Sequence, residues 1–445
     1  MSHPGDAGLP RRGRVPLVAL DVTRMALAPV RRAPRGIDRV ELAYGRHFLH
    51  RWPGRCVGVL PTAWGVRVYD RATLLRGLAA IEALWRETIA PDEDPILTRA
   101  KAFLAGEDLP ALPRRSLKPG IWEQARGFFR LYSNTGILLG HSAARMLPES
   151  SIYLNVGQLE VFAPALAWLN RRPDVLSVFM IHDVIPLELP EHHTPFGIAM
   201  HERIVRNTAR FARALIAPSH AAGVSVRRAV APHGNADRPI YAGTLPPPPE
   251  FLVPAARDPV LEQARYFVVS GVIDAYKNHL LLLEVWKTLV ARQGLSAPRL
   301  VIAGSPGVTG GAVLAWIERH PELRSHVLLA AGLSTGAMHS LVAHADALLM
   351  PSLAEGFGLP IVEALAQGTP VIASDIAAHR EAGAGGDVTY LPPTDREAWL
   401  AAIAAFSGRA DVTMNYRPKL WDDYFTELTA FLLAQTDASR SKTVS

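Results

Sequence analysis

The segment PSLAEGFGLPIVEALAQGTPVIASD (residues 351–375) joins the end of one apolar strand to a glycine-rich turn, a helix that starts at Pro360, and a second apolar strand. Two carboxylates, Glu355 and Glu363, flank the turn with seven residues between them. Strands that read as continuous apolar runs are typical of parallel sheets, because both of their faces are covered. The segment therefore predicts one strand–helix–strand unit of a parallel sheet.

Similar apolar runs recur along the whole chain, each ending in small, polar or turn residues. Helix-like stretches at 279–294 and 335–345 lie between them. This alternation predicts an α/β fold with doubly wound parallel sheets. The expected strands fall within residues 15–22, 56–60, 151–156, 176–183, 214–219, 266–271, 299–304, 326–332, 347–352 and 370–375.

A chain of 445 residues is too long for one ordinary domain, and the segment GTLPPPPEF (243–251) provides a break. Four consecutive prolines cannot continue a helix or a central strand, so they indicate a stiff linker. We therefore expect domains at 1–246 and 247–445, with a helical insertion at about 61–150 in the first. Within it, residues 122–140 are expected to pack on the domain, with a membrane-surface helix as the alternative.

Composition narrows the class of protein. The chain carries 47 Lys and Arg against 41 Asp and Glu, with arginine clusters at 11–14 and 31–35 that are either solvated or face anionic lipid or phosphate. Zinc-ligand spacing and a basic stripe interleaved with aromatic residues are both missing from the sequence, so no nucleic-acid partner is expected. A single cysteine, Cys56, and the lack of an apolar run of about 18 residues predict a soluble, cytoplasmic protein.

The turn at 353–359 has the features of a ligand site, since ligands of open α/β sheets bind beyond the carboxyl ends of the strands. Gly356 and Gly358 allow the backbone to approach a ligand, and the free N–H groups at the helix start attract an anion. Glu355 and Glu363 could then accept hydrogen bonds from hydroxyl groups, which together suits a phosphorylated sugar. The simpler alternative for Glu363 is complementation of the helix dipole in the first turn.

Other candidate residues also follow apolar strands. His182 and Asp183 end the run at 176–183, where a histidine is either a structural hydrogen-bonding group or a catalytic one, and where Asp183 orients the imidazole or caps the next turn. Lys277 follows the run at 266–271 and is either a phosphate ligand or a solvated loop lysine. Gly36 and Arg39 open a helix after the first strand, where another helix N-terminus could meet phosphate.

These motifs resemble a known family. EGFGLPIVE followed by ALAQGTPVIASD is similar to the signature of the retaining, nucleotide-sugar-dependent glycosyltransferases of family 4, also called glycosyl transferases group 1, which have the GT-B fold. The segments at 35–49, 182–191, 271–286 and 300–307 follow in the order of that family. The resemblance implies two Rossmann-like domains facing across a cleft, the first for the acceptor and the second for the donor. It also allows the last helix to pack back on the first domain.

The resemblance implies a role for each candidate residue. Glu355 would bind hydroxyls of the donor sugar and Glu363 those of the ribose, while His182 would contact the donor sugar at the reacting centre. The family often has an arginine where this chain has Val272 and Tyr276, so its diphosphate site has one cation fewer. The remaining donor-binding residues would be Lys277, Gly271, Gly36, Arg39, Gly356, Phe357, Gly358 and Leu359, with residues 331–335 near the base.

By the same resemblance, the chain would transfer a sugar to a glycan or lipid-linked oligosaccharide in surface polysaccharide synthesis. GDP-mannose is the first choice of donor and UDP-sugars the second. No cofactor or metal ion is expected, and the protein could contact the cytoplasmic face of the membrane. Two alternatives stay open: an epimerase or phosphorylase of the same fold, and a non-catalytic partner in glycan assembly.

Overall fold

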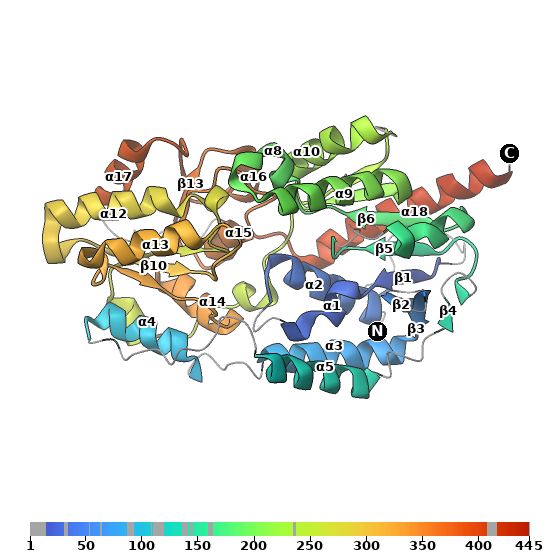
Figure 1. The fold of residues 1–445 in the computed structure, drawn as a ribbon, viewed down its shortest axis with the longest axis horizontal. Helices are drawn as coiled ribbons and strands as arrows, with labels where there is room; N and C mark the ends of the chain where they lie inside the picture. Colours follow the sequence, from blue (N-terminus) through green and yellow to red (C-terminus); the bar gives the residue numbers. More distant parts are fainter. Residues whose placement is uncertain are drawn as a thin grey trace, which may run out of the picture.

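The structure, a computed structural model, describes residues 15–30, 34–52, 54–62, 65–86, 93–107, 109, 120–135, 141–142, 146–158, 163–234, 237–406 and 416–444. Two separate β-sheets, each flanked by helices on both faces, lie side by side in it (Figure 1). The first sheet ends at Ala242 and the second begins at Tyr266. The predicted α/β class with two doubly wound sheets is confirmed.

The first sheet has the strand order β4-β3-β2-β1-β5-β6-β7-β8. Its strands are parallel from β2 to β8, whereas β3 pairs antiparallel with both β2 and β4. The predicted parallel sheet thus has one antiparallel edge, formed by β3 with β2 and β4. The strands are β1 (Val18–Asp21), β2 (Cys56–Thr62), β3 (Gly65–Tyr69), β4 (His141–Ser142), β5 (Ile152–Asn155), β6 (Leu176–Met180), β7 (Ala214–Ala217) and β8 (Ile240–Ala242).

Most helices of the first half of the chain lie around this sheet (Figure 1). The α-helices are α1 (Thr23–Ala26), α2 (Gly36–His50), α3 (Arg71–Arg86), α4 (Pro95–Ala105), α5 (Ile121–Thr135), α7 (Ala163–Leu166), α8 (Ile185–Glu188), α9 (Pro195–Phe211) and α10 (His220–Val230). The 3-10 helices are η1 (Ala28–Val30), η4 (Ala167–Arg171), η5 (Pro190–His192), η6 (Ala231–His233) and η7 (Pro249–Leu252).

The second sheet is parallel throughout and has the order β11-β10-β9-β12-β13-β14. Its strands are β9 (Tyr266–Ser270), β10 (Arg299–Ala303), β11 (Val327–Leu329), β12 (Ala347–Met350), β13 (Val371–Ser374) and β14 (Val388–Leu391). The order reverses between β9 and β12, so the loops after these two strands diverge and leave room for a ligand.

The helices around the second sheet complete the fold. The α-helices are α11 (Pro259–Gln263), α12 (His279–Gln293), α13 (Gly311–Arg319), α14 (Thr335–His344), α15 (Leu359–Ala366), α16 (Ala377–Ala382), α17 (Arg396–Ala404) and α18 (Trp421–Val444). Short 3-10 helices lie at η8 (Ala275–Lys277), η9 (Gly294–Ser296) and η10 (Pro321–Leu323).

Burial explains why these sequences form central strands. Every residue of β1, β5, β6, β7, β9, β12 and β13 is buried, as expected for strands covered on both faces. Successive side chains alternate between faces: Val18 and Leu20 pack in one apolar cluster and Ala19 in another. The first of these clusters also includes residues of β9, β12 and α15, so the apolar core continues from one domain into the other.

The last helix, α18, crosses back to the first domain (Figure 1). The hydroxyl groups of Tyr424 on α18 and Tyr44 on α2 are hydrogen-bonded at 2.6 Å, and Phe425 stacks on His47 with ring centroids 4.0 Å apart. The indole N–H of Trp421 donates to the carbonyl of Pro247. The proline segment between the sheets is therefore packed beneath α18 and largely buried.

Helix α4 comes from the first half of the chain but packs on the second domain, the reverse of α18. Although it belongs to the insertion expected on the first domain, it packs against α11 beside the second sheet (Figure 1). Asp94 caps α4 through Oδ1, which accepts from the N–H of Ile96 at 2.8 Å, and its Oδ2 accepts from the N–H of Ser334 at 2.9 Å. Arg299 on β10 donates to the carbonyl of Leu104. The expectation for this part of the insertion was wrong because these contacts join residues about 200 positions apart, which local patterns do not reveal.

Among the described residues, no helix has both the length and the apolar character needed to cross a membrane.

We predict that Asp94→Ala destabilises the protein by about 2 kcal/mol. The fully buried carboxylate accepts hydrogen bonds both from the first N–H groups of α4 and from the N–H of Ser334, and the variant loses both. Thermal unfolding followed by circular dichroism measures the effect as a lower Tm. Asp70→Ala, which removes the exposed cap of α3, is the matched control and should cost about 1 kcal/mol or less. Equal losses in the two variants would contradict the bridging role of Asp94.

Candidate active site

The carboxyl end of β12 meets the carboxyl end of β6 across the two domains. A Cβ atom added to Gly356 would overlap the carbonyl oxygen of His182 and approach Asp183 Cβ at 3.2 Å. The hydroxyl of Ser219, the N-cap of α10, donates to the carbonyl of Gly356 at 2.6 Å. The turn at 355–358 therefore lies directly against the first domain, and only glycine fits at position 356.

The glycine turn leads into α15 as predicted, but the helix begins one residue earlier than expected. Gly358 has φ 109°, a left-handed conformation that favours glycine, and α15 starts at Leu359, so Pro360 is its second residue. Glu363 is then the fifth helical residue and lies in the second turn. The interpretation of Glu363 as a first-turn dipole partner was therefore wrong.

Glu355 is held by two groups of its own domain. Its Oε1 accepts from Lys277 Nζ at 2.5 Å and from the Ser352 hydroxyl at 2.8 Å. Burial alone would raise the pKa of this carboxyl, but the nearby Lys277 and His379 side chains outweigh it, and the pKa is lowered. Glu355 is thus a charged carboxylate with a cation in direct contact.

Lys277 reaches this position from η8, in the loop after β9. Gly271, at φ 136°, begins that loop, and a Cβ there would lie 3.9 Å from Lys277 Nζ. Tyr276 stacks on His193 of the first domain, with ring centroids 5.3 Å apart, and Lys277 Nζ lies 5.3 Å from the Tyr276 ring. Tyr276, one of the positions where the family often has arginine, is therefore an aromatic contact between the two domains.

Glu363 is paired with a residue of the first domain. Its Oε1 accepts from Arg39 Nη1 at 2.8 Å, and only 2% of its side chain is exposed. Burial raises the pKa of Glu363, whereas Arg39 opposes that rise. A Cβ on Gly36, at the start of the same helix α2, would lie 3.6 Å from Leu359 Cδ1, so α2 begins next to α15.

His182 is buried, and its ring orientation is set by a backbone group. Its Nε2 contacts the carbonyl oxygen of Val156 at 2.8 Å, and its own N–H donates to Gln158 Oε1. Burial lowers the pKa of His182 to about 4, so the imidazole is neutral at pH 7. Asp183 Oδ1 accepts a hydrogen bond from the N–H of Ile185 at 3.3 Å. This contact agrees with the alternative in which Asp183 caps the turn that follows the strand.

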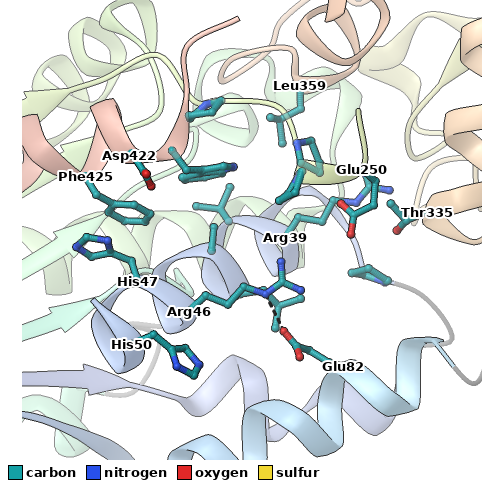
Figure 2. A pocket seen from close by; sticks show the side chains of 18 of the residues that line it. Arg39, Arg46, His47, His50, Glu82, Glu250, Thr335, Leu359, Asp422 and Phe425 are labelled. Atoms are coloured by element: carbon teal, nitrogen blue, oxygen red, sulfur yellow. Dashed lines mark hydrogen bonds and ion pairs between the residues drawn. The ribbon is translucent and has the colours of Figure 1, made fainter. Parts of the chain in front are cut away.

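A pocket of about 540 Å³ lies beside the Arg39–Glu363 pair, between the domains. Figure 2 shows Arg39, Arg46, His47 and His50 along one face of α2, with Phe425 and Asp422 of α18 facing them. Thr335 and Leu359 of the second domain line its other end. Its volume is within the range of small-molecule sites, about 300–1,000 Å³.

The structure brings the predicted residues together as two adjoining groups. Lys277, Gly271, Glu355 and the turn at 356–359 lie against His182 and Asp183, while Glu363 lies with Arg39 and Gly36. No three of the described His, Cys, Asp and Glu side chains are arranged so that they could hold a metal ion.

Sequence reasoning missed several residues that shape this region. Glu381, on α16, accepts from the N–H groups of His220 and Ala221 at the start of α10, at 2.8 and 3.1 Å. His379 is fully buried, and its Nε2 has no hydrogen-bond partner, although its Cδ2 lies near Gly358. A serine after a strand could have indicated the Ser219 cap, but no local signal indicates contacts between the domains.

The second domain is similar to known proteins. Residues 256–409 match the profile of the family described as glycosyl transferases group 1. The chain is 40% identical over 82 residues to the O-antigen chain mannosyltransferase RfbU of Salmonella typhimurium, a match that covers 18% of this chain and 23% of that protein. It is 27% identical over 225 residues to the serotype-specific mannosyltransferase WbdA of Escherichia coli, covering 47% of this chain and 27% of that protein. These matches span about a quarter of the length of each relative.

Solved structures agree on the fold. The N-terminal domain of the Candida albicans trehalose-6-phosphate phosphatase superposes with a TM-score of 0.55 at 10% identity, covering 98% of this chain and 95% of that one. The UDP-forming α,α-trehalose-phosphate synthase of Burkholderia vietnamiensis gives a TM-score of 0.51 at 13% identity, covering 96% and 95%. The predicted GT-B arrangement of two α/β domains is confirmed.

We predict that Gly356→Ala separates the two domains without unfolding either one, since the new methyl group meets a backbone oxygen that cannot rotate away. Small-angle X-ray scattering should show an increased radius of gyration with an unchanged circular dichroism spectrum. Gly311→Ala, where a Cβ meets open space, should leave the radius of gyration unchanged. An unchanged radius in Gly356→Ala would show that the 355–358 turn does not control the approach of the domains.

Proposed function

Because residues 256–409 match the profile of the glycosyl transferases group 1 family, we propose that this chain is a retaining glycosyltransferase that uses a nucleotide-sugar donor. The observation that carries the proposal is the contact between the 355–358 turn, with its Lys277–Glu355 pair, and His182 of the other domain. This arrangement sets the turn that carries the Lys277–Glu355 ion pair against the backbone of the loop that carries His182.

In this proposal, the donor lies along the carboxyl ends of β9 and β12. The backbone N–H groups at the start of α15 and the Lys277 ammonium hold the diphosphate, since a helix N-terminus and a cation both favour negative charge. Glu355 accepts hydrogen bonds from hydroxyls of the sugar. Glu363 accepts them from the ribose, and the base lies near Thr335, at the end of the pocket.

The reaction breaks the bond between the anomeric carbon and the diphosphate oxygen, and forms a bond from the acceptor oxygen to that carbon. Negative charge develops on the leaving diphosphate, where Lys277 and the α15 amides stabilise it by preorganised electrostatics. The leaving phosphate oxygen takes the acceptor proton on the same face of the sugar, so the configuration is retained. We expect no metal ion to be needed, because these groups already compensate the developing charge.

His182 would act as a neutral hydrogen-bonding group at the sugar. Its low pKa, about 4, results mainly from burial and keeps the ring uncharged through the physiological range. A neutral imidazole that is held by the Val156 carbonyl can orient a hydroxyl without adding charge near the oxocarbenium-like centre. Asp183 supports the turn that presents His182.

The donor and acceptor are proposed from the names of the relatives. RfbU and WbdA are both named as mannosyltransferases, and RfbU acts on the O-antigen chain by its name. We therefore propose GDP-mannose as the donor, with UDP-sugars as the second choice, and a glycan or lipid-linked oligosaccharide as the acceptor. Work on surface polysaccharide precursors at the cytoplasmic face of the membrane would follow from such an acceptor.

The nucleotide is identified by thermal shift of the purified protein with GDP-, UDP- and dTDP-sugars, with Glu363→Ala alongside. Stabilisation by one base, lost in the variant, supports the donor site. Conversion of the donor without an acceptor would instead indicate an epimerase, and consumption of free phosphate a phosphorylase. No stabilisation by any nucleotide sugar, with and without an acceptor glycan, would favour the non-catalytic alternative.

We predict that Glu355→Ala and His182→Ala each reduce the transfer rate by at least about 100-fold, since each removes a group aimed at the reacting sugar. Both proteins should keep the circular dichroism spectrum of the wild type. The rate is measured as release of nucleoside diphosphate in the presence of acceptor. Full turnover by either variant would refute the assignment of that residue.

We predict that Arg39 acts through Glu363, because a buried carboxylate without its cation takes up a proton. Arg39→Ala and Glu363→Ala should each weaken nucleoside diphosphate binding at least about tenfold, and the double variant should bind no more weakly than either single one. Calorimetry of the four proteins measures this coupling. Additive losses would mean that Arg39 binds the nucleotide by itself.

The pH dependence of nucleotide binding also distinguishes an Arg39 that acts through Glu363 from one that binds the nucleotide directly. Without Arg39, the pKa of Glu363 rises, so the proton-accepting carboxylate is lost at a higher pH. As the pH falls, Arg39→Ala should therefore lose nucleotide affinity at a higher pH than the wild type. pH profiles with the same midpoint in the two proteins would contradict this mechanism.

A further inference from the structure

One end of the pocket between the domains carries a carboxylate that the proposed reaction does not use. Glu250, in η7, lines the pocket together with Thr335 and Arg39, and Figure 2 shows these three side chains at the same end of it. Glu250 is exposed, and its side chain forms no hydrogen bond or ion pair with any other residue that the structure describes. A hydrogen-bond acceptor therefore faces the pocket without a partner in the protein.

The backbone that carries Glu250 is fixed to the second domain. The next residue, Phe251, is fully buried, and its ring contacts that of His339 on α14, with centroids 5.0 Å apart. Gln367, which follows α15, donates hydrogen bonds from Nε2 to the carbonyls of Phe251 and Val253, at 2.6 and 3.0 Å. Glu250 thus extends from a turn that α14 and α15 hold in place.

The position of this carboxylate is unfavourable for the fold. Burial is the main reason why the pKa of Glu363 is raised, and the negative charge of Glu250 raises that pKa further. The nearby guanidinium of Arg39 is bonded to Glu363. A simpler role for Glu250 is to complement the dipole at the start of α14. That role does not explain a second acid beside Glu363, whereas a ligand that donates hydrogen bonds to Glu250 does.

Hydrogen-bond chemistry identifies the group that such a carboxylate selects. An ionised carboxylate only accepts hydrogen bonds, and its two oxygens match a pair of parallel donors. Guanine offers such a pair on one edge, as N1–H and the 2-amino group. Uracil and thymine offer one N–H between two carbonyl oxygens, which a carboxylate repels, and adenine offers an amino group beside an acceptor nitrogen. Of these bases, only guanine can satisfy both oxygens of Glu250.

We propose that Glu250 determines the specificity for the base by accepting hydrogen bonds from N1–H and the 2-amino group of guanine. The inference rests on the proposed function, which places the ribose at Glu363 and the base at the Thr335 end of the pocket. Guanine bound there gives Glu250 two charge-assisted hydrogen bonds. Leu359, which also lines the pocket, offers the base an apolar contact. Glu250 is thus a reason to expect a guanine nucleotide that does not depend on the names of the relatives.

The test is calorimetry of the full chain with GDP, UDP and inosine diphosphate, which is GDP without the 2-amino group. The wild type should bind GDP at least about tenfold more tightly than UDP, the discrimination expected from one bidentate pair. It should bind inosine diphosphate more weakly than GDP, because one hydrogen bond is lost. Glu250→Ala should lose at least about tenfold in GDP affinity, lose none for UDP, and bind GDP and inosine diphosphate alike.

Glu322→Ala is the matched control. Glu322 follows Pro321 in η10 as Glu250 follows Pro249 in η7, and both glutamates are exposed, but Glu322 does not line the pocket. This variant should bind all three nucleotides as the wild type does. Circular dichroism and Tm check that both variants keep the fold, and the comparison of GDP with inosine diphosphate on the wild type needs no variant.

The outcomes distinguish this inference from the proposed function. No binding of any nucleoside diphosphate by the wild type would overturn both. Equal affinity for GDP and UDP, or a preference for UDP, would overturn the role of Glu250 and leave the donor site in place. The same holds if Glu250→Ala weakens GDP and UDP binding equally, as a purely structural role predicts, or leaves the preference for GDP unchanged.

Discussion

The structure depends on the pairing of buried carboxylates at the carboxyl ends of the second sheet. Glu355 and Glu363 are both almost fully removed from solvent, and a charge in such a place must have a partner. Glu355 finds Lys277 within its own domain, whereas Glu363 finds Arg39 in the other one. The relative position of the domains is thus linked to the charge state of the site, because moving the domains apart would leave Glu363 buried without its cation.

Other contacts also hold the two domains together. Ser219 bonds the Gly356 carbonyl, and the start of α10 receives the Glu381 carboxylate, as a helix N-terminus receives any anion. Two elements also cross between the domains: α18 packs on α2, and α4 packs beside α11. The proline segment at 243–251 is itself packed beneath Trp421. Moving the domains apart would therefore break these contacts.

The sequence predicted the parts of this molecule that are governed by local chemistry. All ten expected strands are present, because a strand buried on both faces needs a continuous apolar run. The turn at 355–358 was recognised from its glycines, and α5 from its length and aromatic residues. Strands β3, β4, β8 and β14, which lie at or next to the sheet edges, were missed. Of these, β3, β8 and β14 are half-exposed and lack such a run. The crossing of α4 and the Arg39–Glu363 pair were missed because they join residues hundreds of positions apart.

Buried ion pairs contribute little to the stability of a fold. Removing two charges from water costs several kcal/mol per ion, and apolar replacements of similar volume are often neutral or stabilising, by about 1–4 kcal/mol. Lys277–Glu355 and Arg39–Glu363 thus occupy places where apolar side chains would serve the fold as well or better. Their presence is explained if each pair can exchange its internal partner for a polar, phosphate-bearing ligand. Lys277 can turn from Glu355 to a phosphate of the ligand. Glu363 can accept a hydrogen bond from a ligand hydroxyl while it stays paired with Arg39. The charges are thus compensated before and after binding.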